Sequence, residues 1–537
     1  MIVRPLANVR PPQPSSPLVM EQVEASLRSG NLADAEQLLR RRLLTEPGDF
    51  DALVKLADLL VVQDRRPEAI HCLKRALVAA PAVHGLRLHL VRLLHGERDL
   101  DHALDELSAI GEPVRSGLEA LAIEAAILGE LGRHEEQLAI YAKLVRDHPG
   151  DETLWMSHGN ALKTVGRTDA AVRAFRRAIR ARPSFGEAYW SLANLKTFKF
   201  DGRDLVAMRK ALAGLLSESD ALHFHFALGK ALEDRGDAEN SFRHYVAGNH
   251  IRRARLTPAQ VSAAAHVDAT IATFGKALFD GFREAGDPAR DPIFVVGLQR
   301  SGSTLVEQIL ASHPLIEGTA ELVAIPQIWE RLGQHDGANG DSFAALARLD
   351  AADLKELGAK YLRRTRAHRV TERPMFVDKL PANWMYAGFI RLILPNARII
   401  DARRHPIACG FSNFKQHYAT GVSYAYGLDS IGRFYADYVR QMEHLDEVQP
   451  GAVHRIINER LIEEPEREIR SLLDFVGVPF DPACMEFHRN KRAVQTPSSE
   501  QVRRPINSEG VDSWRPYEPW LGPLKDALGE ALDNWDR

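Results

Sequence analysis

The sequence predicts a multidomain protein in which an N-terminal, all-α superhelical solenoid is followed by an α/β domain with a mostly parallel sheet. Three observations support this fold class. The chain has 537 residues, which is too many for one ordinary hydrophobic core. Prolines mark a regular period in the first half. In the second half, a glycine-rich turn lies between an apolar, β-branched run and a helical pattern.

The period in the first half is 34 residues, which is the length of a helix-turn-helix repeat unit. In the clearest unit, residues 151–183, Gly166 falls at the turn and Phe175 lies with Ala171 and Ala178 on one face of the second helix. Proline ends the unit because it cannot extend the helical ladder. The prolines that set the phase are spaced by 34, 68 and 34 residues: Pro47, Pro81, Pro149 and Pro183.

These positions resemble the tetratricopeptide repeat over roughly residues 16–253, with a weak unit at 83–116 and a later unit shifted by two residues. The resemblance implies about seven units and a concave surface that holds a protein or peptide partner. A dimerisation or spacing element is the alternative, so a homodimer stays open. We expect a flexible, Pro-rich leader at 1–17, the solenoid at 18–253, a helical connector at 254–290 and the α/β domain at 291–537.

Composition argues against several classes of protein. The formal net charge is -3, from 69 Lys+Arg against 72 Asp+Glu, so nucleic acid is not favoured as the main partner. The three cysteines show no paired or metal-ligand spacing, which fits a reducing compartment. No apolar run approaches eighteen residues and the N-terminus lacks a signal-peptide pattern. We therefore expect no membrane association and a cytoplasmic location.

The loop QRSGST follows the predicted strand PIFVVGL and opens the predicted helix LVEQILASHP, which is the context of an anion-binding loop. Gly297 and Gly302 are five residues apart, and Ser303 stands where a nucleotide triphosphatase would carry lysine. A triphosphate with Mg²⁺ needs that lysine. A phosphosulfate carries less charge on the transferred group, so Arg300 can supply the one cation. A second β-rich run, ARIIDARR, favours a parallel sheet.

This loop resembles the 5′-phosphosulfate loop of sulfotransferases that use 3′-phosphoadenosine 5′-phosphosulfate (PAPS). The likeness is strongest to tyrosylprotein sulfotransferases and to bacterial enzymes that join tetratricopeptide repeats to such a domain. It implies that Arg404 and Ser412, eight residues apart, hold the 3′-phosphate, with Arg403 as the alternative anchor. His405 stands where relatives often have Asp. For the 5′ end, the resemblance implies cofactor contacts by Arg300, Ser301, Gly302, Ser303 and Thr304.

The same resemblance implies the catalytic residues. Glu321, in GTAELVAIPQIW, is the expected base that takes the proton of the acceptor hydroxyl, and a capping or solvated glutamate is the alternative. Lys379, in FVDKLPANW, is expected to stabilise charge on the bridging oxygen and the sulfuryl group, and ion-paired scaffolding is its alternative. Asp378 precedes this lysine, whereas in relatives an acid more often follows. We expect His313 to cap or pack at the end of the first helix.

Towards the C-terminus, PSSEQVRRPINSEG resembles a further segment of these enzymes. On that match, Ser498 bonds near the sulfuryl group as a catalytic residue, with Ser499 as a rival and a solvated loop as the alternative. Arg504 reaches the phosphates of the nucleotide. Asn458 stands where a tyrosine is common, which argues against a nucleotide contact at that position.

The predicted activity is transfer of a sulfuryl group from PAPS to an acceptor hydroxyl, with release of adenosine 3′,5′-bisphosphate and no metal. A peptide tyrosine is one candidate acceptor, and saccharide, lipid and small-molecule hydroxyls stay open. One alternative is a metal-dependent P-loop kinase, for which Asp401 could bind Mg²⁺, although Ser303 argues against it. The other is a non-catalytic scaffold with a degenerate nucleotide-binding domain.

Overall fold

The computed structural model describes residues 17–195, 197–334, 340–418, 421–490, 492 and 501–536. The predicted leader, apart from Pro17, lies outside these residues, as do Ser498 and Ser499. The chain divides into two compact units, Met1–Ala161 and Leu162–Arg537. The domain boundaries expected from the sequence, at 17, 253 and 290, stay predictions.

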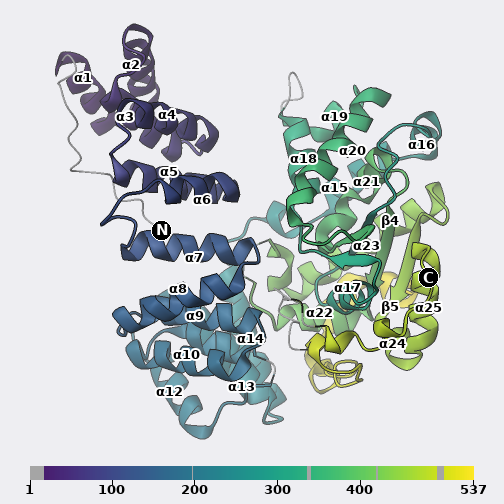
Figure 1. The fold of residues 1–537 in the computed structure, drawn as a ribbon. Coiled ribbons are helices and arrows are strands. Elements are labelled where there is room, and N and C mark those ends of the chain that lie inside the picture. Colours follow the sequence, from purple (N-terminus) through teal and green to yellow (C-terminus); the bar gives the residue numbers. More distant parts are fainter. Residues whose placement is uncertain are drawn as a thin grey trace. The chain divides into compact units, whose positions relative to one another are not determined.

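Helices fill the predicted solenoid (Figure 1). The first helices of successive pairs begin at residues 50, 84, 118, 152 and 186, a constant step of 34 residues. The predicted period is therefore confirmed, including the weak unit, whose second helix has only nine residues. The helices are α1 (Pro17–Arg28), α2 (Leu32–Thr45), α3 (Phe50–Val62), α4 (Arg66–Ala79), α5 (His84–Gly96), α6 (Leu100–Ser108), α7 (Leu118–Glu130), α8 (His134–Asp147), α9 (Glu152–Thr164), α10 (Thr168–Ala181), α11 (Gly186–Ala193), α12 (Gly202–Leu212), α13 (Glu218–Glu233) and α14 (Ala238–Arg253).

Small and large apolar residues at helical spacing explain why the repeats pack. On α4, Ala69, Leu73 and Ala76 are fully buried on one face, because alanine lets a neighbouring helix approach while leucine fills the space between units. The turn after α9 needs a left-handed backbone, which Gly166 supplies with φ of +78°. On α10, the second helix of this pair, Phe175 is likewise fully buried.

The second half contains a five-stranded, fully parallel sheet of order β2-β3-β1-β4-β5. Continuous apolar runs build the central strands, and all six residues of β1 are buried. The predicted α/β domain with a mostly parallel sheet is thus confirmed. The strands are β1 (Pro292–Gly297), β2 (Ile316–Gly318), β3 (Met375–Asp378), β4 (Arg398–Arg403) and β5 (Val453–Ile457).

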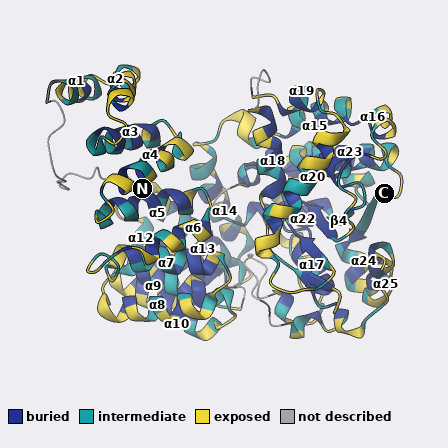
Figure 2. Cartoon of the chain, turned by 45° about the horizontal axis from the view of Figure 1, so that its top comes forward, coloured by how far each residue is buried: buried dark blue, intermediate teal, exposed yellow. Residues whose placement is uncertain are grey.

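Helices cover both faces of the sheet (Figure 1). On one face, α17 (Ser303–Ala311), α24 (Asn458–Glu463) and α25 (Pro465–Val476) share an apolar core with β1 and β4. On the other, Tyr361 of α20 (Ala351–Thr365) packs against Phe294, with ring centroids 5.3 Å apart. Figure 2 shows how deeply β4 and α17 are buried. The second unit also contains α15 (Ala264–Thr273), α16 (Lys276–Gly281), α18 (Ala324–Gly333), α19 (Ser342–Leu346), α21 (Ala387–Ile393), α22 (Pro406–Phe414), α23 (Leu428–Val448), α26 (Gly522–Leu528) and α27 (Ala531–Asn534).

The last repeat helix, α14, packs directly on the α/β domain within the second unit. The Asn249 side-chain amide donates to the Phe414 carbonyl at 2.8 Å, just where α22 ends. Phe242 stacks on Trp520 with ring centroids 5.3 Å apart. Buried polar groups that bond across an interface make separation costly, because each would lose its partner. The end of α22 is therefore held by the repeats.

Among the residues that the structure describes, no helix combines the length and the apolar character needed to cross a membrane. The longest, α23, has 21 residues, and it pairs an apolar face with charged side chains on the other, among them Asp429, Arg433 and Asp437. It is therefore an amphipathic helix that covers one face of the sheet.

We expect Phe175→Ala to lower the free energy of unfolding by about 3–5 kcal/mol, because it removes a fully buried ring and leaves a cavity. The control is Val206→Ala on α12, where the side chain is 65% exposed and the change should stay within about 0.5 kcal/mol. Urea unfolding followed by helical circular dichroism measures both. Equal transition midpoints for the two variants would contradict the packing described for α10.

Candidate active site

The carboxyl ends of the five strands meet at one edge of the sheet, because all strand pairs are parallel. The glycine loop follows β1, Lys379 follows β3, Arg404 follows β4 and Asn458 follows β5. Glu321 comes three residues after β2. The strand order reverses around β1, which is the switch point at which open α/β sheets bind ligands. The topology therefore collects the predicted site residues at one edge.

The loop after β1 has a backbone that only certain residues tolerate. Gly302 precedes α17 with φ of +100°, and a Cβ there would lie 2.6 Å from Asn458 Oδ1. Glycine is required at this position both for the left-handed conformation and for space. Arg300 also has a positive φ, +68°, which is uncommon for a residue with a side chain. The loop thus presents the amide groups at the start of α17, where anions bind readily.

A pocket of about 150 Å³ lies at this edge. Its lining includes the apolar side chains of Phe487 and Val511. Among the described residues that line it, three are arginines and none is Asp or Glu, so the pocket favours an anion. It brings together six residues predicted to bind the nucleotide: Arg300, Gly302, Ser303, Thr304, Arg404 and Arg504.

Two other residues predicted to bind the nucleotide, Ser412 and Ser301, are not among the described residues that line the pocket. Ser412 Oγ accepts a hydrogen bond from Arg300 Nε at 3.0 Å, so α22 orients the loop arginine. Ser301 is buried, and its hydroxyl has no hydrogen-bond partner among the described residues. The predicted contact of Ser412 with a 3′-phosphate stays a prediction. What the structure shows is a link between Ser412 and the opposite end of the predicted nucleotide site.

The structure assigns different surroundings to Arg404 and to Arg403, the alternative anchor for the 3′-phosphate. Arg403 is fully buried, forms an ion pair with Asp401 at 2.7 Å and donates to the Trp535 carbonyl at 2.7 Å. Arg404 instead lines the pocket and donates to the Arg300 carbonyl at 3.2 Å. Burial lowers the pKa of the Arg404 guanidinium, and the positive charge of Arg300 lowers this pKa further. An anion between the two guanidinium groups would relieve that repulsion.

Asp401, considered as a magnesium ligand for a kinase, is already engaged by protein groups. Its carboxylate pairs with Arg403 and with Arg455, the latter at 3.2 Å, and it accepts a hydrogen bond from the Tyr438 hydroxyl. Its side chain is completely buried on the face opposite α17. These contacts favour a structural role and weaken the case for the kinase alternative.

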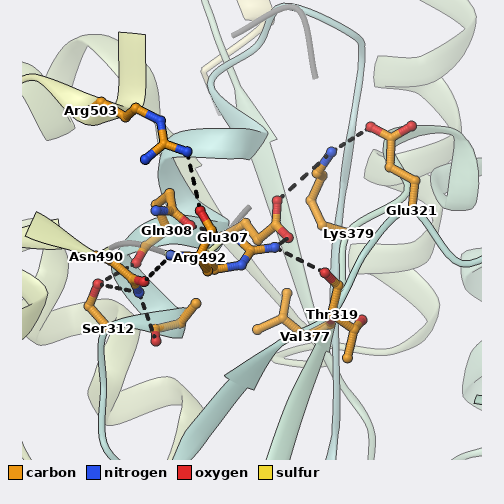
Figure 3. Close-up of polar contacts among 11 residues, drawn as sticks. Glu307, Gln308, Ser312, Thr319, Glu321, Val377, Lys379, Asn490, Arg492 and Arg503 are labelled. Carbon is orange, nitrogen blue, oxygen red and sulfur yellow. Dashed lines mark hydrogen bonds and ion pairs between the residues drawn. The ribbon is translucent and has the colours of Figure 1, made fainter. Parts of the chain in front are cut away.

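The two predicted catalytic residues Lys379 and Glu321 form an ion pair, with 2.5 Å between Nζ and Oε1 (Figure 3). Sheet register explains this, because Gly318 of β2 lies opposite Val377 of β3, so the chain segments that follow run side by side. The Lys379 side chain is only 2% exposed, whereas that of Glu321 is 47% exposed. A ligand can therefore reach the carboxylate while the ammonium stays protected from water.

Three further residues of the site were missed or doubted from the sequence. Glu307 Oε2 lies 3.9 Å from Lys379 Nζ, and Glu307 Oε1 bonds to Arg492 Nη2 at 2.5 Å (Figure 3). A charged residue within the apolar helix LVEQIL was the available signal for Glu307. Arg492 gave no comparable signal. Asn458, doubted as a nucleotide contact, lines the pocket beside Gly302.

The remaining predicted residues lie as follows. His313 is buried, and its Nε2 bonds to the Pro479 carbonyl at 2.9 Å, which fits the packing role expected for it. The His405 ring stacks on Trp514, with centroids 5.8 Å apart. Arg504 lines the pocket and pairs with Glu509 at 3.0 Å. Ser498 lies outside the described residues, so its predicted role stays a prediction.

Fold and site together define a P-loop-type α/β domain that follows a helical-repeat region and carries a cationic pocket at its strand ends. Residues 292–482 match the model of the sulfotransferase family. Residues 48–182, within the helical region, match the model of the bacterial transcriptional activator domain. The chain therefore joins a sulfotransferase-family domain to an N-terminal region of tetratricopeptide-type repeats.

Among curated relatives, an uncharacterized protein of Aquifex aeolicus is 34% identical over 314 residues, which are 57% of this chain and 41% of that protein. A putative protein-tyrosine sulfotransferase of Caenorhabditis briggsae is 25% identical over 231 residues, which are 41% of this chain and 80% of that protein. The solved sulfotransferase domain of the Synechococcus PCC 7002 olefin synthase is 23% identical with a TM-score of 0.32, covering 43% of this chain and 89% of that domain. The chain thus spans less than half the length of the Aquifex relative.

Replacing the two adjacent arginines should change the free energy of unfolding by very different amounts. Arg403→Met leaves the buried Asp401 carboxylate without its closest cation, so we expect a loss of about 3–5 kcal/mol in the free energy of unfolding. Arg404→Met removes a pocket cation that Arg300 repels, so we expect a change of about 1 kcal/mol or less. Chemical unfolding measures both. A larger loss for Arg404→Met than for Arg403→Met would reverse the two assignments.

Proposed function

We propose that this protein transfers a sulfuryl group from PAPS to an acceptor hydroxyl. The observation that carries the proposal is the pocket that Arg300, Arg404 and Arg504 line together with the start of α17. A doubly phosphorylated adenosine has negative charge at both ends and an apolar base between them. The three cations suit its phosphates, and the apolar lining residues Phe487 and Val511 suit the base.

Each end of the nucleotide would have its own group of residues. Residues 300–304 would hold the 5′-phosphosulfate through the amides at the start of α17 and the Arg300 guanidinium. Arg404 would bind the 3′-phosphate, and Arg504 would add charge from the C-terminal segment. Ser412, bonded to Arg300, would connect the two ends. This arrangement supports the proposal because arginine recognises phosphate and sulfate oxygens through two donors at once.

The chemical step would be an in-line displacement at sulfur. The acceptor oxygen forms a new bond to sulfur while the bond from sulfur to the nucleotide oxygen breaks, and that electron pair leaves with adenosine 3′,5′-bisphosphate. Glu321, whose carboxylate is half exposed, takes the acceptor proton. Lys379 lies 2.5 Å from Glu321 and would turn towards the charge that develops on the leaving oxygen. No step in this scheme requires a metal.

A peptide tyrosine is the acceptor that the comparisons favour, since several curated relatives bear the name protein-tyrosine sulfotransferase. Tetratricopeptide-type repeats commonly hold peptides, so the solenoid would present this substrate or recruit a partner protein. The packing of α14 against the end of α22 supports this, because it holds the last repeat beside the helix that carries Ser412.

Incubation of the purified protein with ³⁵S-labelled PAPS and a cell extract tests the proposal. We expect label in protein or peptide, and Glu321→Gln should lower the rate by about a hundredfold or more, because the base is lost. Binding of adenosine 3′,5′-bisphosphate should stay within about threefold in this variant. Glu330→Gln, on the exposed side of α18, is the matched control. Full sulfation by Glu321→Gln would refute the assigned base, and no transfer by the unaltered protein would refute the activity.

Calorimetry with adenosine 3′,5′-bisphosphate tests the pocket itself. Arg300→Met and Arg404→Met should each weaken binding by at least about tenfold, because each removes charge-assisted bonds to a phosphate or sulfate group. Arg283→Met, on an exposed surface of the same unit, should leave the affinity unchanged. Tighter binding of ATP with Mg²⁺ than of the bisphosphate would favour a kinase instead.

A further inference from the structure

Four charged side chains alternate in sign along one line beside the candidate active site (Figure 3). Arg492 pairs with Glu307 at 2.5 Å, Glu307 lies 3.9 Å from Lys379, and Lys379 pairs with Glu321 at 2.5 Å. Glu321 is the half-exposed member, whereas the side chains of Glu307 and Lys379 are each 2% exposed. The line therefore begins at Glu321, which a substrate can reach, and continues to Lys379 and Glu307 in the protein interior.

Buried charge needs compensation, because removing an ammonium group from water costs several kcal/mol unless it is paired. In the described part of the chain, the carboxylates paired with Lys379 are Glu307 and Glu321. The adjacent Asp378 also interacts electrostatically with Lys379 and Glu307, but burial raises the pKa of its carboxyl group to about 8, which favours the neutral form near pH 7. If Glu321 accepts the acceptor proton, it becomes neutral during the reaction. Glu307 is then the carboxylate that continues to compensate Lys379, at the moment when Lys379 must stay charged.

We propose that Glu307 is a positioning residue that keeps the Lys379 ammonium group paired and aimed at the reacting sulfuryl group, and that Arg492 holds the Glu307 carboxylate in place. This inference deepens the sulfotransfer proposed above and rests on it. Glu307 acts through Lys379, since the two groups are 3.9 Å apart in an enclosed site where charge interactions are strong.

The contacts of Arg492 show how the position of Glu307 is set. Besides Glu307, its guanidinium donates to the Gln308 side-chain oxygen at 2.6 Å and to the Thr319 carbonyl at 3.0 Å. Gln308 neighbours Glu307 on α17, and Thr319 lies two residues before Glu321. One guanidinium thus ties the helix that follows the glycine loop to the segment that carries the proposed base.

Glu307 also lies on the same helix as the pocket. Ser303 lines the pocket, and Glu307 follows it by four residues, one helical turn along α17. A ligand that settles against the start of α17 would therefore act on the same rigid element that carries the counter-ion of Lys379. Glu307 connects the nucleotide pocket with the proposed base in this way.

Glu307→Gln removes the charge and keeps the size and shape of the side chain. We expect kcat to fall by about ten- to a hundredfold while KM for PAPS stays within about threefold. Loss of a negative charge lowers the pKa of every neighbouring group. The acidic limb of the pH–rate profile, from Glu321, and the alkaline limb, from Lys379, should therefore both move to lower pH.

Glu317→Gln is the matched control. Glu317 is also buried, but its Oε1 accepts bonds from the Val370 and Thr371 amides at 2.7 and 2.8 Å. This variant should change stability without shifting the acidic or the alkaline limb of the pH–rate profile. Glu307→Asp restores the charge, so it should regain the pH profile of the unaltered protein and most of kcat. Unshifted limbs in Glu307→Gln, or an Asp variant that behaves like the Gln variant, would overturn the proposal.

Titration of Lys379 provides a readout that needs no sulfotransfer. With ¹³Cε-labelled lysine, the Lys379 signal is assigned by its loss in Lys379→Met. We expect it to titrate at lower pH in Glu307→Gln than in Glu317→Gln or the unaltered protein. An unchanged titration would refute the role of Glu307 even in an active enzyme. Absence of transfer from PAPS, with the shift present, would refute the proposed activity alone.

Discussion

Parallel pairing of β1 with β3 and β4 is the constraint on which the rest of the site depends. It places the end of every strand at one edge, so residues that are far apart in the chain become neighbours. Arg300 and Arg404 are joined by a hydrogen bond across 104 residues. The register of β2 against β3 similarly sets Glu321 beside Lys379. An antiparallel sheet would distribute these groups between two opposite edges.

Charge is distributed at this edge in two different ways. In the pocket, cations gather without a carboxylate among the described lining residues, so the pocket is left to attract an anion. Beside it, four side chains of alternating charge neutralise one another pair by pair: Arg492, Glu307, Lys379 and Glu321. The first arrangement favours binding of a charged ligand. The second holds a buried ammonium group in place at a cost that its carboxylate partners offset.

The last repeat helix is hydrogen-bonded directly to the α/β domain. Within the second unit, α14 bonds to the last carbonyl of α22, and Ser412 on α22 bonds to the loop arginine. A short path of two hydrogen bonds and one helix therefore leads from the repeats to Arg300.

Lys379, Glu321 and Arg404 were predicted from the resemblance to sulfotransferases. The sequence by itself determined the repeat period and the strand, loop and helix around Gly302. These features are local, because helix spacing, β-branched runs and turn glycines act over a few residues. Where a residue had a neighbour with the same chemistry, local pattern could not choose between them. Arg403 and Arg404 are the clearest example.

Tertiary structure alone decided that Arg403 belongs to Asp401 and that Arg404 faces the pocket. It also revealed Glu307 and Arg492, which are 185 residues apart and meet because the C-terminal segment returns to α17. Which distant charges pair depends on how the chain folds, so such pairs produce no periodic pattern in the sequence. Burial then gives each pair its strength, since a charge removed from water depends on the partner that the fold supplies.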